Sequence, residues 1–353
     1  MMRTKFGARC RGPGAVAIFI FGLFCDIGFS AAQETRFFRI GAAATSGSFF
    51  ELGGVIASAI SKPDGSPPCE HGGNCGVPGL VAVTEATQGS VENLRMVGAG
   101  QIESSIAQSD IVSWAYRGTG IFAADGPIKN LRMIASLFPE SLQLVVRADS
   151  SIRTLADLRG AHVSLGQAGS GTLADARAVL AAVGLSEKDL IGEYLRPGVA
   201  AAEVREGKLD GFFLIGGTPV PAIRELATAV PVRLIPVEDN VLARMRENST
   251  SYRRSVIPAE TYPGIDDNTP SVGFEAVWVV SADATDELIY EITKALWNDA
   301  TRRLLDSHNP IGKQVRIEHA LDAAPAPLHP GAKRYYREIG LKVDDDGIAG
   351  KSE

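Results

Sequence analysis

The sequence predicts an α/β protein built from two lobes. Apolar strand-like runs alternate with amphipathic helical segments over most of the 353 residues, a length that favours two lobes over one. Two loops rich in Gly, Ser and Thr, at residues 41–48 and 163–172, each join a strand to a helix. The first N–H groups of a helix lack internal partners and carry the positive end of the helix dipole, so each loop is suited to an anion. One such loop alone is ordinary helix capping; two of them predict two half-sites for one small acid.

The first block of elements follows from the spacing of its apolar residues. A strand is predicted at 37–43, followed by a helix at 49–61 whose apolar residues recur at helical spacing. The elements predicted next are a strand at 80–85, a helix from 90 to about 98, a strand at 102–107, a helix at 108–116, and strands at 131–137 and 142–147. This block is typical of an open α/β sheet, whose ligands lie beyond the carboxyl ends of the strands.

The alternation restarts at residue 154 and predicts a second sheet. Its expected elements are a strand at 161–165, a helix at 173–183 ended by Gly184, a strand near Tyr194, a helix to Val204, a strand at 211–215, a helix at 222–227 and a strand at 232–237. Extended segments at 142–147 and 273–281 flank this block, which predicts that the chain crosses between the lobes twice. The first lobe is then residues 33–142 with 275–353, and the second lobe is residues 143–274.

Residues 1–32 have the three zones of a secretory signal peptide. Basic residues precede an apolar run at 15–24 that is too short to span a membrane comfortably, and small residues at 30–32 suit cleavage after Ala32. The prediction is therefore an exported, periplasmic protein. A lipid anchor on Cys25 is the alternative, which the bulky Phe24 beside it disfavours.

Charge excludes one class of partner. Removing residues 1–32 takes away four basic residues and Asp26, which changes the formal charge from −6 to −9. An acidic protein without a basic stripe has no means of neutralising nucleic-acid phosphates. An anionic ligand must therefore be held by local geometry.

Two cysteines follow the signal segment, Cys69 and Cys75, with a Gly-rich spacer between them. In an oxidising compartment this pattern predicts a disulfide that closes a surface loop. A metal site that includes His71 is the alternative, although no fourth ligand is evident. No metal, cofactor or catalytic residue is predicted elsewhere.

The predicted ligand-binding residues come from both loops and from two other strand ends. N–H groups and hydroxyls are expected to hold a carboxylate, and Phe49 to wall the cleft; the full set is Thr45, Ser46, Gly47, Ser48, Phe49, Gln108, Ser109, Ser170, Gly171, Thr172, Gly217, Thr218 and Pro219. Each has a structural alternative. Gln108 and Ser109 could cap a helix, residues 217–219 could be a plain turn, Phe49 could be a core residue, and Arg147 is a solvated charge or a hinge partner.

Several motifs, in order and spacing, resemble a known family. They are residues 89–94 (GSVENL) with 108–110 (QSD), 157–160 (DLRG) leading to 169–172 (GSGT), 210–213 (DGFF) with 217–219 (GTP), and the closing 328–332 (LHPGA), 335–338 (YYRE) and Gly340. Over residues 38–340 the chain resembles the TAXI-type solute receptors of tripartite ATP-independent periplasmic (TRAP) transporters.

The resemblance implies a two-lobed periplasmic-binding-protein type II fold with two crossing segments, which closes on a small organic acid and delivers it to a membrane permease. A monomer is expected. Two departures bear on the ligand. The family's Tyr-Tyr-Pro is replaced by 49–51 (FFE) and its Tyr-Pro-Glu by 138–140 (FPE), so three phenolic hydroxyls are missing. This favours a ligand less polar than glutamate, or one contacted through water, and Glu51 disfavours a dicarboxylate.

Other functions keep part of this pattern. The same fold serves receptors of ATP-driven importers and of sensor kinases, which fold alone cannot separate. A serine-dependent hydrolase would use Ser48 or Ser170 as nucleophile. The sequence has no Gly-x-Ser-x-Gly elbow, and its five histidines share no evident face with either serine.

Overall fold

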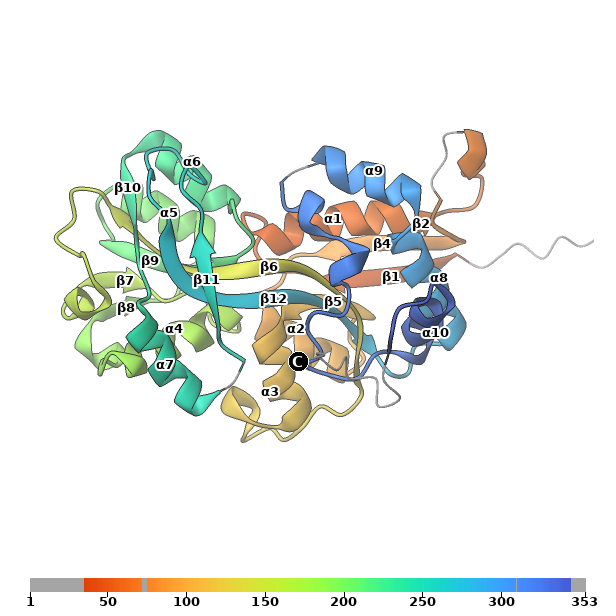
Figure 1. Cartoon of the computed structure of the whole chain (residues 1–353), viewed down its shortest axis with the longest axis horizontal. Helices are drawn as coiled ribbons and strands as arrows, with labels where there is room; N and C mark the ends of the chain where they lie inside the picture. Colours follow the sequence, from red (N-terminus) through yellow and green to blue (C-terminus); the bar gives the residue numbers. More distant parts are fainter. Residues whose placement is uncertain (1–34, 72–74, 250, 309, 344–353) are drawn as a thin grey trace, which may run out of the picture. The chain divides into compact units, whose positions relative to one another are not determined.

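The computed structural model describes residues 35–71, 75–249, 251–308 and 310–343 (Figure 1). The predicted signal peptide, its cleavage site and Cys25 lie outside the described residues. Within these ranges the chain alternates strands and helices, which confirms the predicted α/β class. Among the described helices, none has the length and apolar character that crossing a bilayer requires.

One sheet path connects the strands. Their bounds are Arg36–Gly41 (β1), Ser61–Lys62 (β2), Val77–Pro78 (β3), Leu80–Glu85 (β4), Ser104–Gln108 (β5), Leu131–Arg147 (β6), His162–Ser164 (β7), Ile191–Glu193 (β8), Gly211–Gly216 (β9), Val232–Ile235 (β10), Arg253–Ile257 (β11) and Thr269–Ser281 (β12). Along the path the order is β3-β2-β4-β1-β5-β12-β6-β9-β7-β8, with β10 added to β6 and β11 to β12.

Helices connect most of these strands. Their bounds are Ser48–Ile60 (α1), Ser90–Gly98 (α2), Ser109–Arg117 (α3), Gly171–Ala182 (α4), Pro197–Arg205 (α5), Pro221–Ala229 (α6), Asp239–Asn248 (α7), Asp286–Leu296 (α8), Asp299–His308 (α9) and Pro330–Glu338 (α10). Short 3-10 helices span Cys69–His71 (η1), Gly120–Phe122 (η2), Leu155–Leu158 (η3), Glu187–Asp189 (η4), Gly312–Gln314 (η5) and Ile317–His319 (η6).

The strand order repeats in two parts of the sheet. In one part β4, β1 and β5 are parallel neighbours, followed by antiparallel β12 and then β6. In the other, β8, β7 and β9 are parallel neighbours, followed by antiparallel β6 and then β10. In both parts the strands have the same order across the sheet. The second, first and third strands of that part are followed by the strand that crosses from the other part, and then by the fourth strand. This repeat confirms the two-lobed periplasmic-binding-protein type II fold.

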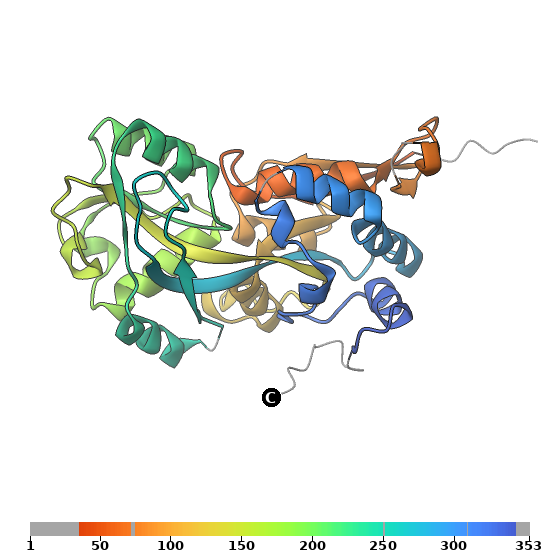
Figure 2. The same cartoon turned by 45° about the horizontal axis from the view of Figure 1, so that its top comes forward.

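Strand β6 belongs to both parts because its partners change along its length. Its first half pairs with β12, from Leu131 opposite Ser281 to Ser141 opposite Gly273. Its second half pairs with β9 and β10. Strands β6 and β12 consequently run side by side between the two parts of the sheet, as both views show (Figure 2). They are the two predicted crossing segments.

Buried apolar side chains form three clusters. One cluster joins residues on β1, β4, β5, α1, α2 and α3 to residues on β12, α8 and α10, and we call this part of the molecule the first lobe. The other two clusters contain residues between Leu142 and Phe274, and we call that part the second lobe. The chain boundaries at 142/143 and 274/275 stay a prediction.

The predicted break between strands at 131–137 and 142–147 is wrong. The structure has one continuous strand, β6, which passes through Pro139. Pro139 has no N–H to give to the sheet, but it lies at an exposed position opposite Glu275, next to the first register shift between β6 and β12. The irregular pairing there accommodates the proline without ending the strand.

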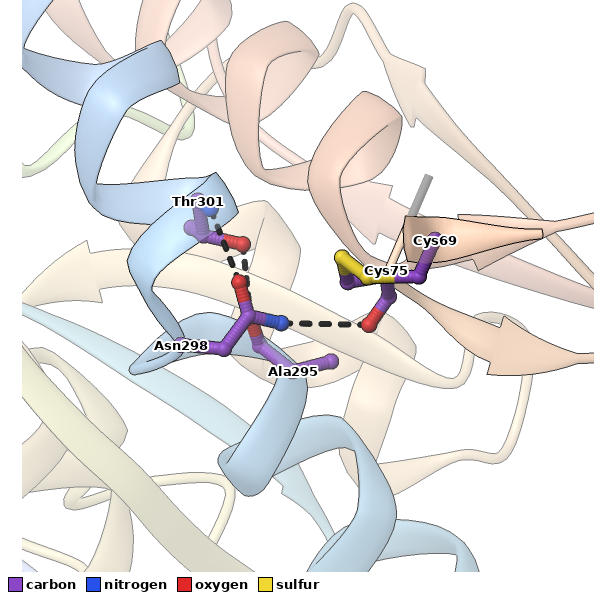
Figure 3. The surroundings of a disulfide bond; sticks show 5 residues. All are labelled: Cys69, Cys75, Ala295, Asn298 and Thr301. Atoms are coloured by element: carbon purple, nitrogen blue, oxygen red, sulfur yellow. Dashed lines mark hydrogen bonds between the residues drawn. A yellow bond between two sulfur atoms is a disulfide. The ribbon is translucent and has the colours of Figure 1, made fainter. Parts of the chain in front are cut away.

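The predicted disulfide is confirmed. Cys69 and Cys75 are bonded, with their Cα atoms 5.0 Å apart. Figure 3 shows how the loop is attached: Asn298 Nδ2 donates to the Cys75 carbonyl at 3.1 Å, and Asn298 Oδ1 accepts the Thr301 N–H at 2.9 Å. A sulfur committed to a disulfide does not ligate a metal as a thiolate, which excludes the alternative metal site on these two cysteines.

Candidate functional site

Among the described elements, four helices begin at one cavity between the lobes. Ser48 is the first residue of α1, Ser90 of α2, Gly171 of α4 and Pro197 of α5. The cavity is lined by Ala43, Ala44, Gly47, Ser48, Phe49, Gln88, Gly89, Ser90, Gln108, Gly166, Gln167, Ser170, Gly171, Thr172, Leu195, Pro197, Phe213, Leu214 and Ile215. The space that the centre of a water molecule can occupy is about 50 Å³, enough for several waters or one small ligand.

The two glycine- and hydroxyl-rich loops meet at this cavity. The predicted site residues among its lining are Gly47, Ser48, Phe49, Gln108, Ser170, Gly171 and Thr172. The remaining predicted residues lie outside the lining. Thr45 is exposed, and the Ser46 hydroxyl accepts the Gly198 N–H at 3.1 Å. The Ser109 hydroxyl accepts the Glu275 N–H at 3.2 Å and lies beside a different groove.

Residues 217–219 also lie outside the lining. The Gly217 N–H donates to Ser48 Oγ at 3.3 Å, so this turn of the second lobe contacts a serine of the first. The Thr218 carbonyl accepts from Gln314 Nε2 at 3.3 Å. Both bonds join the turn to other protein atoms, as expected if residues 217–219 form a plain turn that does not contact the ligand.

Three hydroxyl groups lining the cavity have a free proton. The oxygens of Ser48, Ser90 and Thr172 each accept one backbone N–H, from Gly217 at 3.3 Å, Gln108 at 3.1 Å and Ile215 at 3.1 Å, respectively. A hydroxyl has one donor besides its two acceptor sites. Within the described ranges none of the three donates to a protein acceptor. Each oxygen is thus fixed in place while its proton is available to a ligand.

Ser170 differs from these three. Its hydroxyl donates to the Gln167 carbonyl at 2.7 Å and accepts the Leu173 N–H at 3.1 Å, which caps helix α4. The prediction that this hydroxyl donates to the ligand is therefore not supported by its hydrogen bonds. Its capping role follows from its place immediately before the first helical residue.

Sequence reasoning missed a third loop of the same kind. Gln88, Gly89 and Ser90 line the cavity where β4 leads into α2. The signal was present, because residues 87–90 read Thr-Gln-Gly-Ser between a strand and a helix. Also missed were Ala43, Ala44, Gly166, Gln167, Leu195, Pro197, Phe213, Leu214 and Ile215, most of which lack a polar signal in the sequence.

The cavity wall is mainly apolar and carries no formal charge. In the described part of the chain its lining contains no Lys, Arg, His, Asp or Glu. Phe49 is buried and packs edge-on against Phe138, with ring centroids 6.1 Å apart. The polar groups of the lining are therefore uncharged: hydroxyls, backbone groups at helix N-termini and glutamine amides.

Contacts around the cavity hold the lobes together. The first amides of α2, Val91 N–H and Glu92 N–H, both donate to the Gly169 carbonyl of the second lobe at 3.1 Å. Gln167 Nε2 donates back to the Gln88 carbonyl at 2.5 Å. The N-terminus of α2 thus interacts with the loop of the opposite lobe.

Two buried carboxyl groups from opposite lobes lie behind the cavity. Asp110 is on α3 and Asp175 on α4, and both are fully buried. Gln108 Nε2 donates to Asp175 Oδ2 at 2.9 Å, and the Tyr252 hydroxyl donates to Asp175 Oδ1 at 3.2 Å. Burial raises the pKa of Asp110 to about 6. Burial and the nearby Asp110 raise the pKa of Asp175 well above its ordinary range, so the pair retains a proton near neutral pH.

A third carboxyl, Glu140 on β6, lies near them and is buried as well. Neither of its oxygens has a partner among the described residues. Burial, with Asp110 and Glu275 nearby, raises the pKa of Glu140 well above its usual range. The first lobe therefore contributes one carboxyl group, that of Glu140, which stays uncharged near neutral pH.

The hydrolase alternative finds no triad geometry in the described ranges. The hydrogen bonds of Ser48 and Ser170 go to backbone groups. His162 contacts Glu193, His319 contacts Asp322, and His329 caps α10. Over the same described ranges, no group of three His, Cys, Asp or Glu side chains is arranged to hold a metal ion.

Comparisons with solved structures find matches among periplasmic binding proteins. Similar solved structures include the periplasmic aliphatic sulphonate binding protein SsuA from Escherichia coli, with 15% identity over 78% of this chain and 77% of that chain and a TM-score of 0.41. The alkanesulfonate-binding protein SsuA from Xanthomonas axonopodis pv. citri, bound to MOPS, has 18% identity over 90% and 98%, with a TM-score of 0.44. An ancestral arginine-binding protein bound to arginine has 15% identity over 78% and 99%, with a TM-score of 0.45.

A family model matches most of the chain. It is the model of the NMT1-like family, and it matches residues 40–340, from β1 to the residues that follow α10. That range includes both loops, both crossing strands and every residue that lines the cavity. The chain belongs to the NMT1-like family.

Proposed function

We propose that this chain is an extracytoplasmic solute receptor that binds a small organic acid between its two lobes and delivers it to a TRAP-type membrane permease. The observation that carries the proposal is the meeting of loops from both lobes at one cavity. Ser48 and Ser90 of the first lobe and Thr172 of the second each have a hydroxyl proton free for an anion.

The chemistry of the cavity favours a small monocarboxylate. Helix N-termini and hydroxyl groups stabilise one negative charge without a cationic side chain. The mainly apolar wall suits a short hydrocarbon body, and a second carboxylate would have no donors of its own. Because donors come from both lobes, the ligand stabilises the closed arrangement over an open one.

The hinge of the proposed receptor lies in β6 and β12, near residues 142 and 274. The TRAP assignment rests on the motif resemblance over residues 38–340, and export to the periplasm rests on the signal-peptide pattern at 1–32. No catalysis is proposed, since the serines in the cavity have no base beside them in the described residues.

Calorimetry tests the binding function. The purified chain is titrated with a panel of monocarboxylic, 2-hydroxy, 2-oxo and amino acids, while mass spectrometry identifies any small molecule released from the protein. We expect at least one acid to bind, and the double variant Ser48→Ala/Thr172→Ala to lose about tenfold or more in affinity. The double variant Ser66→Ala/Thr228→Ala, which removes hydroxyls outside the cavity, is the control.

Vesicle uptake tests the partner. Vesicles that contain a TRAP-type permease are given the receptor and the bound acid, with and without internal ATP. Uptake that needs the receptor and an ion gradient supports the proposal. Uptake that occurs only with an ATP-driven importer in its place contradicts the TRAP assignment but leaves the binding function intact.

A further inference from the structure

Gln167 is a cavity residue whose side chain has an unused acceptor. It lies between β7 and α4, lines the cavity and is 5% exposed. Its Oε1 atom is buried and has no hydrogen-bond partner among the described residues. Buried polar atoms without a partner are rare in folded proteins, and such an atom in a binding cavity indicates a missing ligand group.

The orientation of the Gln167 amide is fixed by its other end. Nε2 donates to the Gln88 carbonyl at 2.5 Å and lies 3.4 Å from the Thr87 carbonyl. Turning the amide over would place Oε1 against two carbonyl oxygens, which are acceptors only. The first lobe therefore holds Nε2, and the acceptor Oε1 is left without a protein partner among the described residues.

This acceptor selects among small acids. A plain carboxylate and a 2-oxo group carry only acceptors at neutral pH, so both would leave Oε1 unpaired. A 2-amino group is a donor, but its cation would be buried in a lining that contains no carboxylate among the described residues. A 2-hydroxy group supplies a neutral donor next to the carboxylate.

We infer that Gln167 is a specificity residue that favours 2-hydroxy monocarboxylates. The carboxylate binds the hydroxyls of Ser48, Ser90 and Thr172, and the 2-hydroxyl donates to Gln167 Oε1. This inference rests on the proposed binding function and adds to it the class of ligand.

Two matched sets of acids test the inference. The first is propionate, pyruvate, lactate and alanine; the second is isovalerate, 2-oxoisovalerate, 2-hydroxyisovalerate and valine. In calorimetry with the full chain, we expect the 2-hydroxy member of a set to bind at least about tenfold more tightly than the other three, because a site built around a hydrogen bond rejects analogues that lack it.

The variant Gln167→Met keeps the length of the side chain and removes the acceptor. We expect it to reduce the preference for the 2-hydroxy acid to less than about threefold, while Gln101→Met, at an exposed glutamine outside the cavity, keeps the full preference. Thermal unfolding of both variants checks that they are folded.

The outcomes separate the two proposals. If plain, 2-oxo or 2-amino acids bind as tightly as the 2-hydroxy acid, or if the preference survives Gln167→Met, the specificity inference is overturned and the acid receptor stands. If no acid of either set or of the wider panel binds, both are overturned. Because the comparison among acids uses the unaltered protein, the inference stays testable even if Gln167→Met does not fold.

Discussion

The loops before α1 and before α4 have similar compositions but use different atoms. In the first loop, serine hydroxyls reach the other lobe: Ser46 Oγ accepts from Gly198 and Ser48 Oγ from Gly217. In the second, the serine hydroxyl caps its own helix, and the Gly169 carbonyl makes the contact between lobes. A pattern of Gly, Ser and Thr thus identifies where a site forms, whereas the local hydrogen bonds decide which atoms serve it.

The two loops also differ in the space around their glycines. A Cβ atom on Gly171, in the second loop, would lie 1.9 Å from Gln108 Oε1. A Cβ atom on Gly47, in the first loop, would meet its nearest neighbour, the Ala44 carbonyl oxygen, at 3.3 Å. The second loop needs glycine because the opposite lobe closes directly onto its backbone.

Among the variants considered, Gly171→Ala is therefore expected to reduce ligand affinity the most. The Gln108 amide is held by Asp175, so the new methyl group must break that bond or keep the lobes apart. We expect an affinity loss of about a hundredfold, in the range of overpacking penalties. Calorimetry with the tightest-binding acid of the panel measures it. Gly47→Ala is the matched control, and an equal loss in both variants would contradict the steric difference between the loops.

The helix after the second loop, α4, carries the buried carboxyl of Asp175, whereas α1 after the first loop carries no buried carboxyl. We therefore expect the stability of the protein to depend on pH through Asp175 and the nearby Asp110. Burial raises the pKa of Asp110 from 3.8 to about 6, so the folded protein holds a proton that the unfolded chain releases. This proton contributes its full share to the free energy of unfolding below about pH 4. The contribution decreases as pH rises from about 4 to about 6, by about 3 kcal/mol in total.

Urea unfolding from pH 4 to pH 8 measures this decrease. Asn in place of Asp110 supplies a permanent donor of the same shape, so Asp110→Asn should make the decrease smaller. Asp175 and Glu140, whose pKa values are also raised, keep the remaining slope. Asp125→Asn, at an exposed ion pair, is the control and should keep the slope of the unaltered protein. A profile that Asp110→Asn leaves unchanged would remove the carboxyl pair as its cause.

The two serines should differ in their effect on affinity. Ser48→Ala removes a hydroxyl whose proton is free for the ligand and leaves the Gly217 N–H unpaired, so we expect about a tenfold loss of affinity together with about 1 kcal/mol of lost stability. Ser170→Ala removes a helix cap, and we expect a loss of about 1 kcal/mol of stability with a smaller effect on affinity. Calorimetry and urea unfolding of both variants give the comparison, and a reversed order would contradict it.

Ser46→Ala is expected to have the smallest effect. It removes a single bond to Gly198 at the partly exposed edge of the cavity, where water replaces the lost hydroxyl. We expect an affinity change of less than about threefold by calorimetry. A loss as large as that of Ser48→Ala would mean that contacts between the lobes, and not groups facing the ligand, dominate binding.

Much of the fold could be predicted because it follows from local patterns. The period of apolar residues fixes the helices and strands, and small residues at strand ends mark the loops. The continuity of β6 could not be predicted, because whether Pro139 ends a strand depends on the irregular pairing opposite it. That partner, β12, is far away in the sequence.

The location of the candidate site could be predicted, but the atoms that are available to a ligand could be predicted only in part. Gly171 and Thr172 line the cavity as expected, whereas Ser170 turned out to cap its helix. Gln167 lies within the second loop, yet its role depends on a carbonyl of Gln88 in the other lobe. Contacts between segments of different lobes leave no periodic pattern in the sequence.

The shared strand β6 also sets an order for folding during synthesis. The apolar clusters of the second lobe draw on one continuous stretch of chain, from Leu142 to Phe274. The sheet of the first lobe needs β12 between β5 and β6, so it cannot close until Ser281 has emerged. The lobe that begins first in the chain is thus completed last. Its unpaired strand edges stay exposed in the meantime, at the stage when a nascent chain most needs a chaperone.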